Sequence, residues 1–240
     1  MAPGGPRRSV VAMDTVIVTG ASRGLGLALS RALAERGFRL VIDARDPGPL
    51  EDARAELAQH AEVVAIDGDV AVEEHRRALV EAAGPRVHAL VNNASVLGPS
   101  PQPRLADYPL AELSRVYRVN VLAPLALTQL ALPALQPGGR ILNVTSDAAV
   151  EPYAGWGGYG SSKAALDQIT NILAAEHPEL RVYAVDPGDM NTRMHQEAFP
   201  GEDISDRPPP DASVPGLLAL IEGDLPSGRY WARELAEVAR

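Results

Sequence analysis

The sequence contains no cysteine, so the chain has neither disulfide bonds nor thiolate ligands for a metal ion. Its five histidines also lack the H-E-x-x-H spacing that places metal ligands on one helix face. We therefore expect no metal site, and we interpret the histidines as surface or structural residues: His60, His75, His88, His177 and His195.

Positive charge is also scarce. The chain has 22 Lys and Arg against 31 Asp and Glu, and its formal net charge of −9 disfavours nucleic acid or an anionic membrane as the main partner. No apolar run reaches the length of a membrane span, and residues 1–12 are too short for a signal peptide. The sequence therefore predicts a soluble cytoplasmic protein with a disordered tail at 1–12.

Only two Phe and two Trp are present, so we expect a core of mainly Ala, Val and Leu. Short apolar runs, interpreted as strands, alternate with longer helical patterns. The expected strands are 15–18, 40–42, 63–66, 89–91, 140–144, 181–185 and 229–231, and the expected helices are about 25–36, 50–60, 71–83, 110–135, 158–176 and 213–222.

Strands that are apolar throughout and alternate with helices indicate a parallel sheet covered on both faces. The sequence thus predicts one α/β domain over residues 13–240, a Rossmann-like doubly wound sheet of about seven strands. The stretch at about 189–215 contains Pro208-Pro209-Pro210 and breaks the alternation. We interpret it as a substrate loop or lid, and the alternative is a surface excursion without function.

Three glycines, Gly20, Gly24 and Gly26, lie between the first strand and the first helix. Glycine permits positive φ and close approach of a ligand to the backbone. The free N–H groups at the start of the next helix attract a pyrophosphate. The spacing is G-x-x-x-G-x-G and not the G-x-G-x-x-G fingerprint. We expect a dinucleotide phosphate site here, with a tight turn that binds nothing as the alternative.

The choice of dinucleotide depends on the end of the second strand. A carboxylate there binds the ribose of NAD, whereas an arginine binds the 2′-phosphate of NADP. Arg45 follows this strand, and Arg23 lies in the glycine loop, so two guanidinium groups are available for a phosphate. This favours NADP(H). Asp43 leaves NAD(H) possible, because it would be the ribose ligand if the strand register shifted by one residue.

Tyr159 and Lys163 are four residues apart in an expected helix and therefore lie on one face. A free tyrosine has a pKa of about 10, which is too high for an acid or base at neutral pH. A nearby ammonium favours the phenolate. We expect Lys163, with help from an oxidised nicotinamide and a helix end, to lower the pKa of Tyr159. Ser146 lies upstream of this pair.

Together these segments resemble the short-chain dehydrogenase/reductase family. The resemblance covers essentially all of residues 13–235 and keeps the family's order. The matching pieces are TGASRGLG (19–26), Asp69-Val70, Asn92-Asn93-Ala94, Asn120, GGRILNVTS (138–146), YGSSK (159–163) and Asp186-Pro187-Gly188.

The resemblance implies a role for each matching residue. Tyr159 looks like the general acid or base, Lys163 like its partner and a ligand of the nicotinamide ribose, and Ser146 like the group that polarises the substrate oxygen. Asn120 would hold a water that links Lys163 to solvent. The cofactor-binding residues implied are Gly20, Ser22, Arg23, Gly24, Leu25, Gly26, Arg45, Asp69, Val70, Asn92, Ala94, Tyr159, Lys163, Pro187, Gly188 and Thr192.

The sequence departs from the family pattern at three places. Ser95 stands where the family usually has glycine, and Asp189 places a charge near the expected nicotinamide carboxamide. Residues 227–231 replace the family's usual glycine-rich ending. None of these changes touches the four expected catalytic residues.

The resemblance implies an NADP(H)-dependent oxidoreductase that transfers hydride between nicotinamide and a small carbonyl or alcohol. A non-redox enzyme (an epimerase or dehydratase) and a non-catalytic NADP-binding regulator are the alternatives.

Residues expected near the substrate are Ala148, Ala149, Glu151, Tyr153, Trp156, Met190, Met194 and His195. The helices expected at 110–135 and 158–176 are apolar around much of their circumference, and with the resemblance they predict a homodimer or homotetramer.

Overall fold

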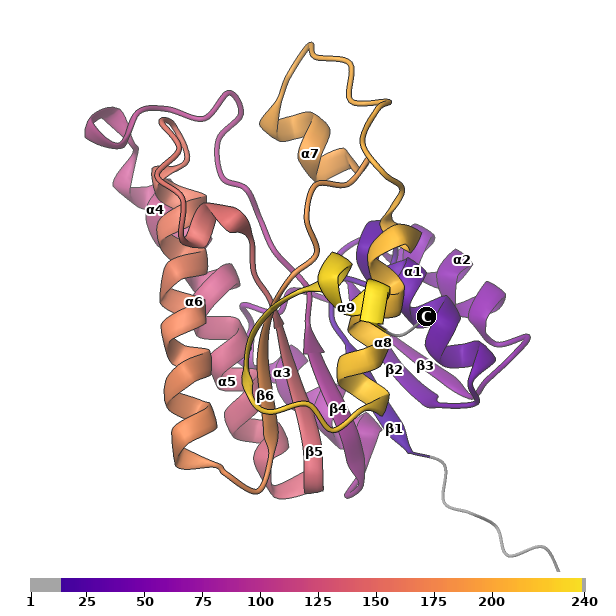
Figure 1. Cartoon of the computed structure of the whole chain (residues 1–240). Helices are drawn as coiled ribbons and strands as arrows, with labels where there is room; N and C mark the ends of the chain where they lie inside the picture. The colour runs from indigo at the N-terminus through magenta and orange to yellow at the C-terminus, as the bar shows by residue number, and fades with distance from the viewer. Residues whose placement is uncertain (1–13, 239–240) are drawn as a thin grey trace, which may run out of the picture.

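A computed structural model describes residues 14–238 (Figure 1). The expected tail at 1–12 lies outside these residues. The strands form one seven-stranded parallel sheet in the order β3-β2-β1-β4-β5-β6-β7, which confirms the predicted fold class. The strands are β1 (Thr15–Val18), β2 (Arg39–Ala44), β3 (Val63–Asp67), β4 (Val87–Asn92), β5 (Leu135–Val144), β6 (Arg181–Asp186) and β7 (Gly228–Trp231).

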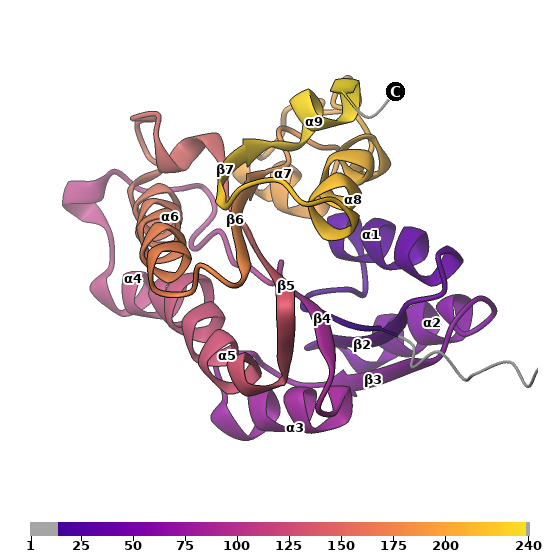
Figure 2. The ribbon, with the colours of Figure 1, turned by 60° about the horizontal axis from the view of Figure 1, so that its bottom comes forward.

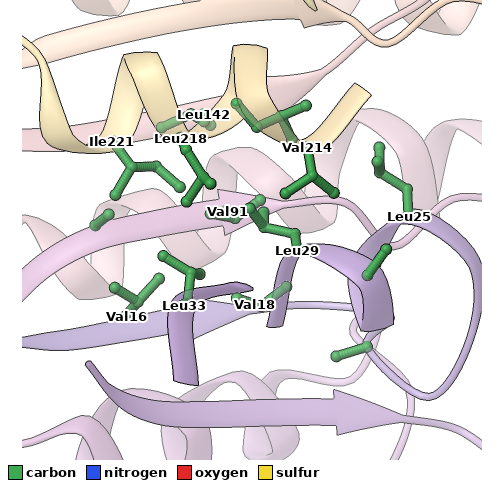
Figure 3. Packing of buried hydrophobic residues seen from close by; sticks show 14 of the residues in the cluster. Val16, Val18, Leu25, Leu29, Leu33, Val91, Leu142, Val214, Leu218 and Ile221 are labelled. Atoms are coloured by element: carbon green, nitrogen blue, oxygen red, sulfur yellow. The ribbon is translucent and has the colours of Figure 1, made fainter. Parts of the chain in front are cut away.

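Helices cover both faces of the sheet (Figure 2). One layer contains α1 (Gly24–Glu35), α2 (Pro47–Leu57) and α8 (Val214–Glu222), and the other contains α3 (Glu73–Ala83), α5 (Ala123–Ala131) and α6 (Gly157–Glu176). Alternate residues of a strand serve opposite layers. Val16 and Val18 pack with Leu29 of α1 and Leu218 of α8 (Figure 3). Ile17 belongs to the core of the other layer.

The chain leaves the centre of the sheet in both directions from β1, which has β2 on one side and β4 on the other. Ligands of doubly wound sheets bind at such a switch point, beyond the carboxyl ends of the strands. Here Thr19 joins the two loops: its Oγ1 accepts hydrogen bonds from the backbone N–H groups of Asn93 and Ala94, both at 3.0 Å.

The helix expected over 110–135 is present as one helical run over residues 110–134, but it is not α-helical throughout. It consists of α4 (Leu110–Tyr117), a π turn (Arg118–Leu122), α5, and a 3-10 turn (Leu132–Ala134). Pro124 explains the departure from α-helical hydrogen bonding. It has no N–H to donate to the carbonyl of Asn120, which would be its acceptor four residues earlier in an α-helix. The chain adopts the wider π turn there, and Asn120 lies at its centre, fully buried.

The segment at 189–215 has more structure than a loop. It contains α7 (Arg193–Ala198), where the Thr192 side chain accepts a hydrogen bond from the His195 N–H, and a 3-10 turn (Pro210–Ser213). In Figure 1, α7 lies beyond the carboxyl ends of the strands.

The sequence analysis also missed α9 (Ala232–Val238). No helix in the described part of the chain combines the length and apolar character that crossing a membrane requires.

Candidate active site

A cavity of about 1140 Å³ lies where the carboxyl ends of the strands meet α7. Most of the residues that the sequence assigned to a site line this one cavity. They are Gly20, Ser22, Arg23, Gly24, Leu25, Arg45, Asp69, Val70, Ala94, Ser146, Tyr159, Lys163, Pro187, Gly188 and Thr192. The cavity is large and continuous enough to hold a dinucleotide together with a small substrate.

Three expected site residues do not line this cavity: Gly26, Asn92 and Asn120. The Asn92 side chain lies in the core, where its Nδ2 donates to Asn143 Oδ1 at 2.8 Å, and the neighbouring Asn93 borders the cavity in its place. A Cβ on Gly26 would overlap the Gly20 carbonyl, so Gly26 shapes the turn from behind.

The glycine loop fits a pyrophosphate. Gly20 and Gly24 have φ of 68° and 56°, the left-handed region that favours glycine. Helix α1 begins at Gly24 with no side-chain cap and no acidic residue in its first turn. Its first N–H groups therefore face the cavity with the positive end of the helix dipole.

The two arginines expected to bind a 2′-phosphate border the same end of the cavity. Arg23 and Arg45 are exposed, and neither forms an ion pair with a side chain of residues 14–235. Asp43 is arranged differently. One carboxylate oxygen accepts from the Gly20 N–H at 2.7 Å, and the other lies 2.9 Å from His75 Nε2. Asp43 therefore holds the glycine loop, and this geometry disfavours the alternative in which it binds the ribose of NAD.

Tyr159 and Lys163 lie one turn apart on α6, as their spacing predicted. Both are buried, and the Lys163 Nζ is 5.5 Å from the centre of the Tyr159 ring. The ammonium donates to the Val144 carbonyl at 2.7 Å. The lysine therefore connects α6 to the last residue of β5, two residues before Ser146.

The expectation that the pKa of Tyr159 is lowered is wrong for this structure. Burial raises its pKa well above the ordinary value of 10, the carboxylates of Asp186 and Asp147 raise it further, and the hydroxyls of Ser146 and Ser95 act in the opposite direction. Burial also lowers the pKa of Lys163 from 10.5 to about 8, because a buried ammonium loses its hydration.

Ser146 and Asp147 both line the cavity and form a hydrogen-bonded pair. The Ser146 hydroxyl donates to Asp147 Oδ1 at 2.8 Å and accepts from the Ala148 N–H at 3.2 Å. Asp147 Oδ2 accepts from the Tyr153 hydroxyl at 3.0 Å. The sequence analysis did not single out Asp147, although its position directly after Ser146 was a usable signal.

Both polar atoms of the Asn120 side chain form two hydrogen bonds each within the protein. Its Oδ1 accepts from the Val96 N–H at 2.9 Å and from the Ser95 hydroxyl at 3.1 Å. Its Nδ2 donates to the Val96 carbonyl at 2.9 Å and to the Ser162 hydroxyl at 3.0 Å. Asn120 thus fastens the loop after β4 to α6, and the water-holding role implied by the resemblance stays a prediction.

Arg229 is a second residue that sequence reasoning missed. It reaches the site from β7, and its Nη2 donates to the Ser146 carbonyl at 3.1 Å and to Asp186 Oδ2 at 3.2 Å. Its Nε donates to Asp167 Oδ2 at 3.1 Å. One guanidinium therefore joins the segment after β5 to β6 and α6, and no local sequence pattern indicates this.

Four of the expected substrate-pocket residues line the cavity: Trp156, Met190, Met194 and His195. The others (Ala148, Ala149, Glu151 and Tyr153) do not. The Trp156 ring packs edge-on against Tyr159, with their centres 5.9 Å apart. The cavity therefore has an apolar, partly aromatic wall beside Tyr159. Among the side chains of residues 14–235, no three His, Asp or Glu are grouped to hold a metal ion.

Comparison with known proteins gives a consistent result. A family model described as short chain dehydrogenase matches residues 14–203. Sepiapterin reductase from Mus musculus is 36% identical over 199 residues, which are 76% of this chain and 76% of the mouse protein. A rhamnolipid-biosynthesis 3-oxoacyl-[acyl-carrier-protein] reductase from Pseudomonas aeruginosa is 32% identical and covers 93% of this chain and 86% of its own length.

A third relative is benzil reductase ((S)-benzoin forming) from Bacillus subtilis, 30% identical over 91% of this chain and 98% of its own. Among solved structures, a short-chain dehydrogenase from Pseudomonas syringae superposes with a TM-score of 0.85 at 27% identity, covering 96% of this chain and 98% of the other. One from Escherichia coli CFT073, complexed with NADPH, has a TM-score of 0.82 at 26% identity and covers 95% and 100%.

Proposed function

The chain belongs to the short-chain dehydrogenase family and is an oxidoreductase, and on this premise we propose that it reduces a small ketone or aldehyde with NADPH, with Tyr159 as general acid. One observation carries the proposal. Ser146, Tyr159 and Lys163 line the cavity from the segment after β5 and from α6, whereas Arg23 and Arg45 line it after β1 and β2, on the other side of β4 in the sheet. The distribution of side chains along this cavity matches a nicotinamide dinucleotide whose 2′-phosphate needs cationic partners.

In the proposed reaction Tyr159 donates its phenolic proton to the carbonyl oxygen. The nicotinamide, when bound, supplies the hydride. Burial and the nearby carboxylates keep the phenol protonated, which suits an acid in the reducing direction. Ser146 donates its hydroxyl hydrogen to the same oxygen and stabilises the negative charge that develops there. Lys163 is positively charged below its pKa of about 8 and favours that charge as well.

The remaining cavity residues would bind and orient the cofactor. Asp69 and Val70 would flank the adenine, and Ala94 would lie at the adenine ribose. Pro187, Gly188 and Thr192 would border the nicotinamide. Thr192 supports this assignment: its methyl group lies 3.7 Å from where a Cβ on Gly24 would be, so the segment after β6 closes over the glycine loop.

We also propose that the protein is a homodimer or homotetramer. Leu122, in the π turn, is 55% exposed, and Ile172, on α6, is 46% exposed. Large apolar side chains on the outer helices gain stability when a second subunit covers them. Size-exclusion chromatography with light scattering tests this assignment, and a monomeric mass would contradict it.

The test of the proposed function is NADPH oxidation with a panel of carbonyl compounds that includes sepiapterin, a 3-oxoacyl thioester and benzil. We expect turnover with at least one ketone, reduced by about 10²- to 10⁴-fold in Tyr159→Phe, the range for loss of a general acid. Substrate conversion without net NADPH oxidation would favour the non-redox alternative. NADPH binding without any conversion would favour the regulator.

A further inference from the structure

The carboxylate of Asp147 stands out at the catalytic end of the cavity. Three other carboxylates border this end, and each has an arginine partner: Asp186 with Arg229 at 3.2 Å, Glu197 with Arg193 at 2.8 Å, and Asp189 with Arg207 at 3.9 Å. Asp147 forms no ion pair with any side chain of residues 14–235. An uncompensated negative charge therefore lies beside the reacting groups.

The charge of Asp147 affects the hydroxyl group of Ser146, because the two side chains are hydrogen-bonded. A serine hydroxyl has one hydrogen, and a carboxylate has none to give. In the structure that hydrogen is donated to Asp147 Oδ1 at 2.8 Å. Ser146 must break this bond before it donates to a substrate carbonyl. The exchange leaves Asp147 Oδ1 with the Ala148 N–H alone, which it accepts at 2.8 Å, and frees a second acceptor position on this half-buried carboxylate.

A substrate with a hydrogen-bond donor of its own can replace the hydrogen bond that Asp147 loses when Ser146 turns away. We propose, resting on the proposed reductase function, that the substrates are ketones with a hydroxyl or amino group on the carbon next to the carbonyl, and that Asp147 accepts the hydrogen bond of that group. Ser146 then turns to the carbonyl oxygen while the substrate donor takes its place on the carboxylate. An adjacent carboxylate, as in a 2-oxo acid, is repelled by the same charge.

The surroundings of Asp147 fit this class of ligand. Its Oδ2 holds only the Tyr153 hydroxyl, from a side chain that is 47% exposed, so a second acceptor position is available there. Trp156 and the two methionines Met190 and Met194 provide an apolar wall for the rest of the molecule. The preferred substrate is therefore an apolar or aromatic ketone whose only strong donor is next to the carbonyl.

The reaction balances with the cofactor of the proposed function. The carbonyl carbon receives the hydride of NADPH, leaving NADP⁺, and the carbonyl oxygen receives the proton of Tyr159, which solvent replaces. The neighbouring donor keeps its hydrogen throughout. An α-hydroxy ketone becomes a vicinal diol, and an α-amino ketone becomes a vicinal amino alcohol.

Two matched ketones test the proposal, 2-hydroxyacetophenone and propiophenone, which differ by a hydroxyl in place of a methyl group. We expect kcat/KM to be about 10- to 100-fold higher for the hydroxy ketone, the range for a hydrogen bond to a charged group. In Asp147→Asn the ratio of the two kcat/KM values should fall to near unity. The kcat/KM for the hydroxy ketone should decrease, and that for propiophenone should increase. Glu151→Gln, an exposed carboxylate outside the cavity lining, is the control and should keep the wild-type ratio.

Tyr153→Phe is the second variant. It removes the side chain that competes for Asp147 Oδ2, so the preference for the hydroxy ketone should increase. A purely structural role of Asp147 predicts no increase. If the wild-type enzyme reduces propiophenone as well as the hydroxy ketone, the inference is overturned and the reductase function stands. If neither ketone reacts, the inference is overturned. Turnover of another ketone of the panel then shows that the reductase function stands, whereas NADPH binding without conversion of any panel compound shows that it fails as well.

Discussion

The carboxylate of Asp43 lies between His75 and the glycine loop, 2.9 Å from His75 Nε2 and 2.7 Å from the Gly20 nitrogen. Asp43 is only 1% exposed and His75 only 8%. A backbone N–H that begins the phosphate-binding turn is therefore held by a buried acid whose second oxygen has its own partner. Through this contact, β2 and α3 position the glycine loop at the point where the cofactor is proposed to bind.

Removing this acid should weaken both stability and cofactor binding. In Asp43→Ala the Gly20 N–H and the His75 ring lose their partner, which should lower the free energy of unfolding by about 1–3 kcal/mol. NADPH affinity should fall as well, because the turn is no longer fixed. Asp43→Asn keeps an acceptor for Gly20 and should lose less of both. Urea unfolding and NADPH fluorescence titration measure the two effects, and equal losses in the two variants would contradict this role.

The choice of NADPH over NADH should depend on Arg45. Replacing it with alanine removes a guanidinium that is proposed to bind the 2′-phosphate, and kcat/KM for NADPH should fall by about 10- to 100-fold. The value for NADH, which has no such phosphate, should change by less than about threefold. Arg77→Ala, an exposed arginine that pairs with Glu73 on α3, is the control. Parallel losses with both cofactors would show that Arg45 does not discriminate between them.

Lys163 should make the stability of the cofactor-free protein depend on pH. Folding lowers its pKa from 10.5 to about 8, so between these values the unfolded chain holds a proton that the folded protein has released. The contribution of Lys163 to stability is therefore fully present above pH 10.5 and is lost as the pH falls through 8. The free energy of unfolding of the wild type, measured relative to Lys163→Met, should rise by about 2 kcal/mol from pH 7.5 to 9.5. A flat or falling difference in urea unfolding would contradict the burial of this ammonium.

Gly26 should tolerate no side chain. A Cβ there would overlap the Gly20 carbonyl, a backbone atom that cannot move without displacing the turn. Gly26→Ala should therefore lower the free energy of unfolding by about 1–3 kcal/mol and raise the Kd for NADPH. Gly48→Ala is the matched control, since the nearest atom to its Cβ is a flexible Asp46 oxygen at 3.9 Å. If both variants unfold at the same urea concentration, the close packing is not the reason for glycine at this position.

The amino-acid sequence determined the features that depend on local spacing. Apolar runs separated by helical patterns define the strands of the sheet, because hydrophobic periodicity acts within a few residues. The glycines after the first strand and the pairing of Tyr159 with Lys163 follow for the same reason. The glycines lie at the first turn of α1, and Tyr159 and Lys163 lie on one face of α6, so each group depends on a single local element.

The tertiary structure alone decided which distant groups meet. Asp43 finds its partner 32 residues along the chain, and Arg229 reaches the Ser146 carbonyl across 83 residues. Neither contact leaves a periodic signal, because each arises only when separate strands and helices pack together. The direction of the pKa shift at Tyr159 belongs to the same class, since it depends on the burial that the assembled fold imposes. The sequence therefore determined the elements and the reactive residues, and three-dimensional packing decided their partners, their charge and the groups that face the substrate.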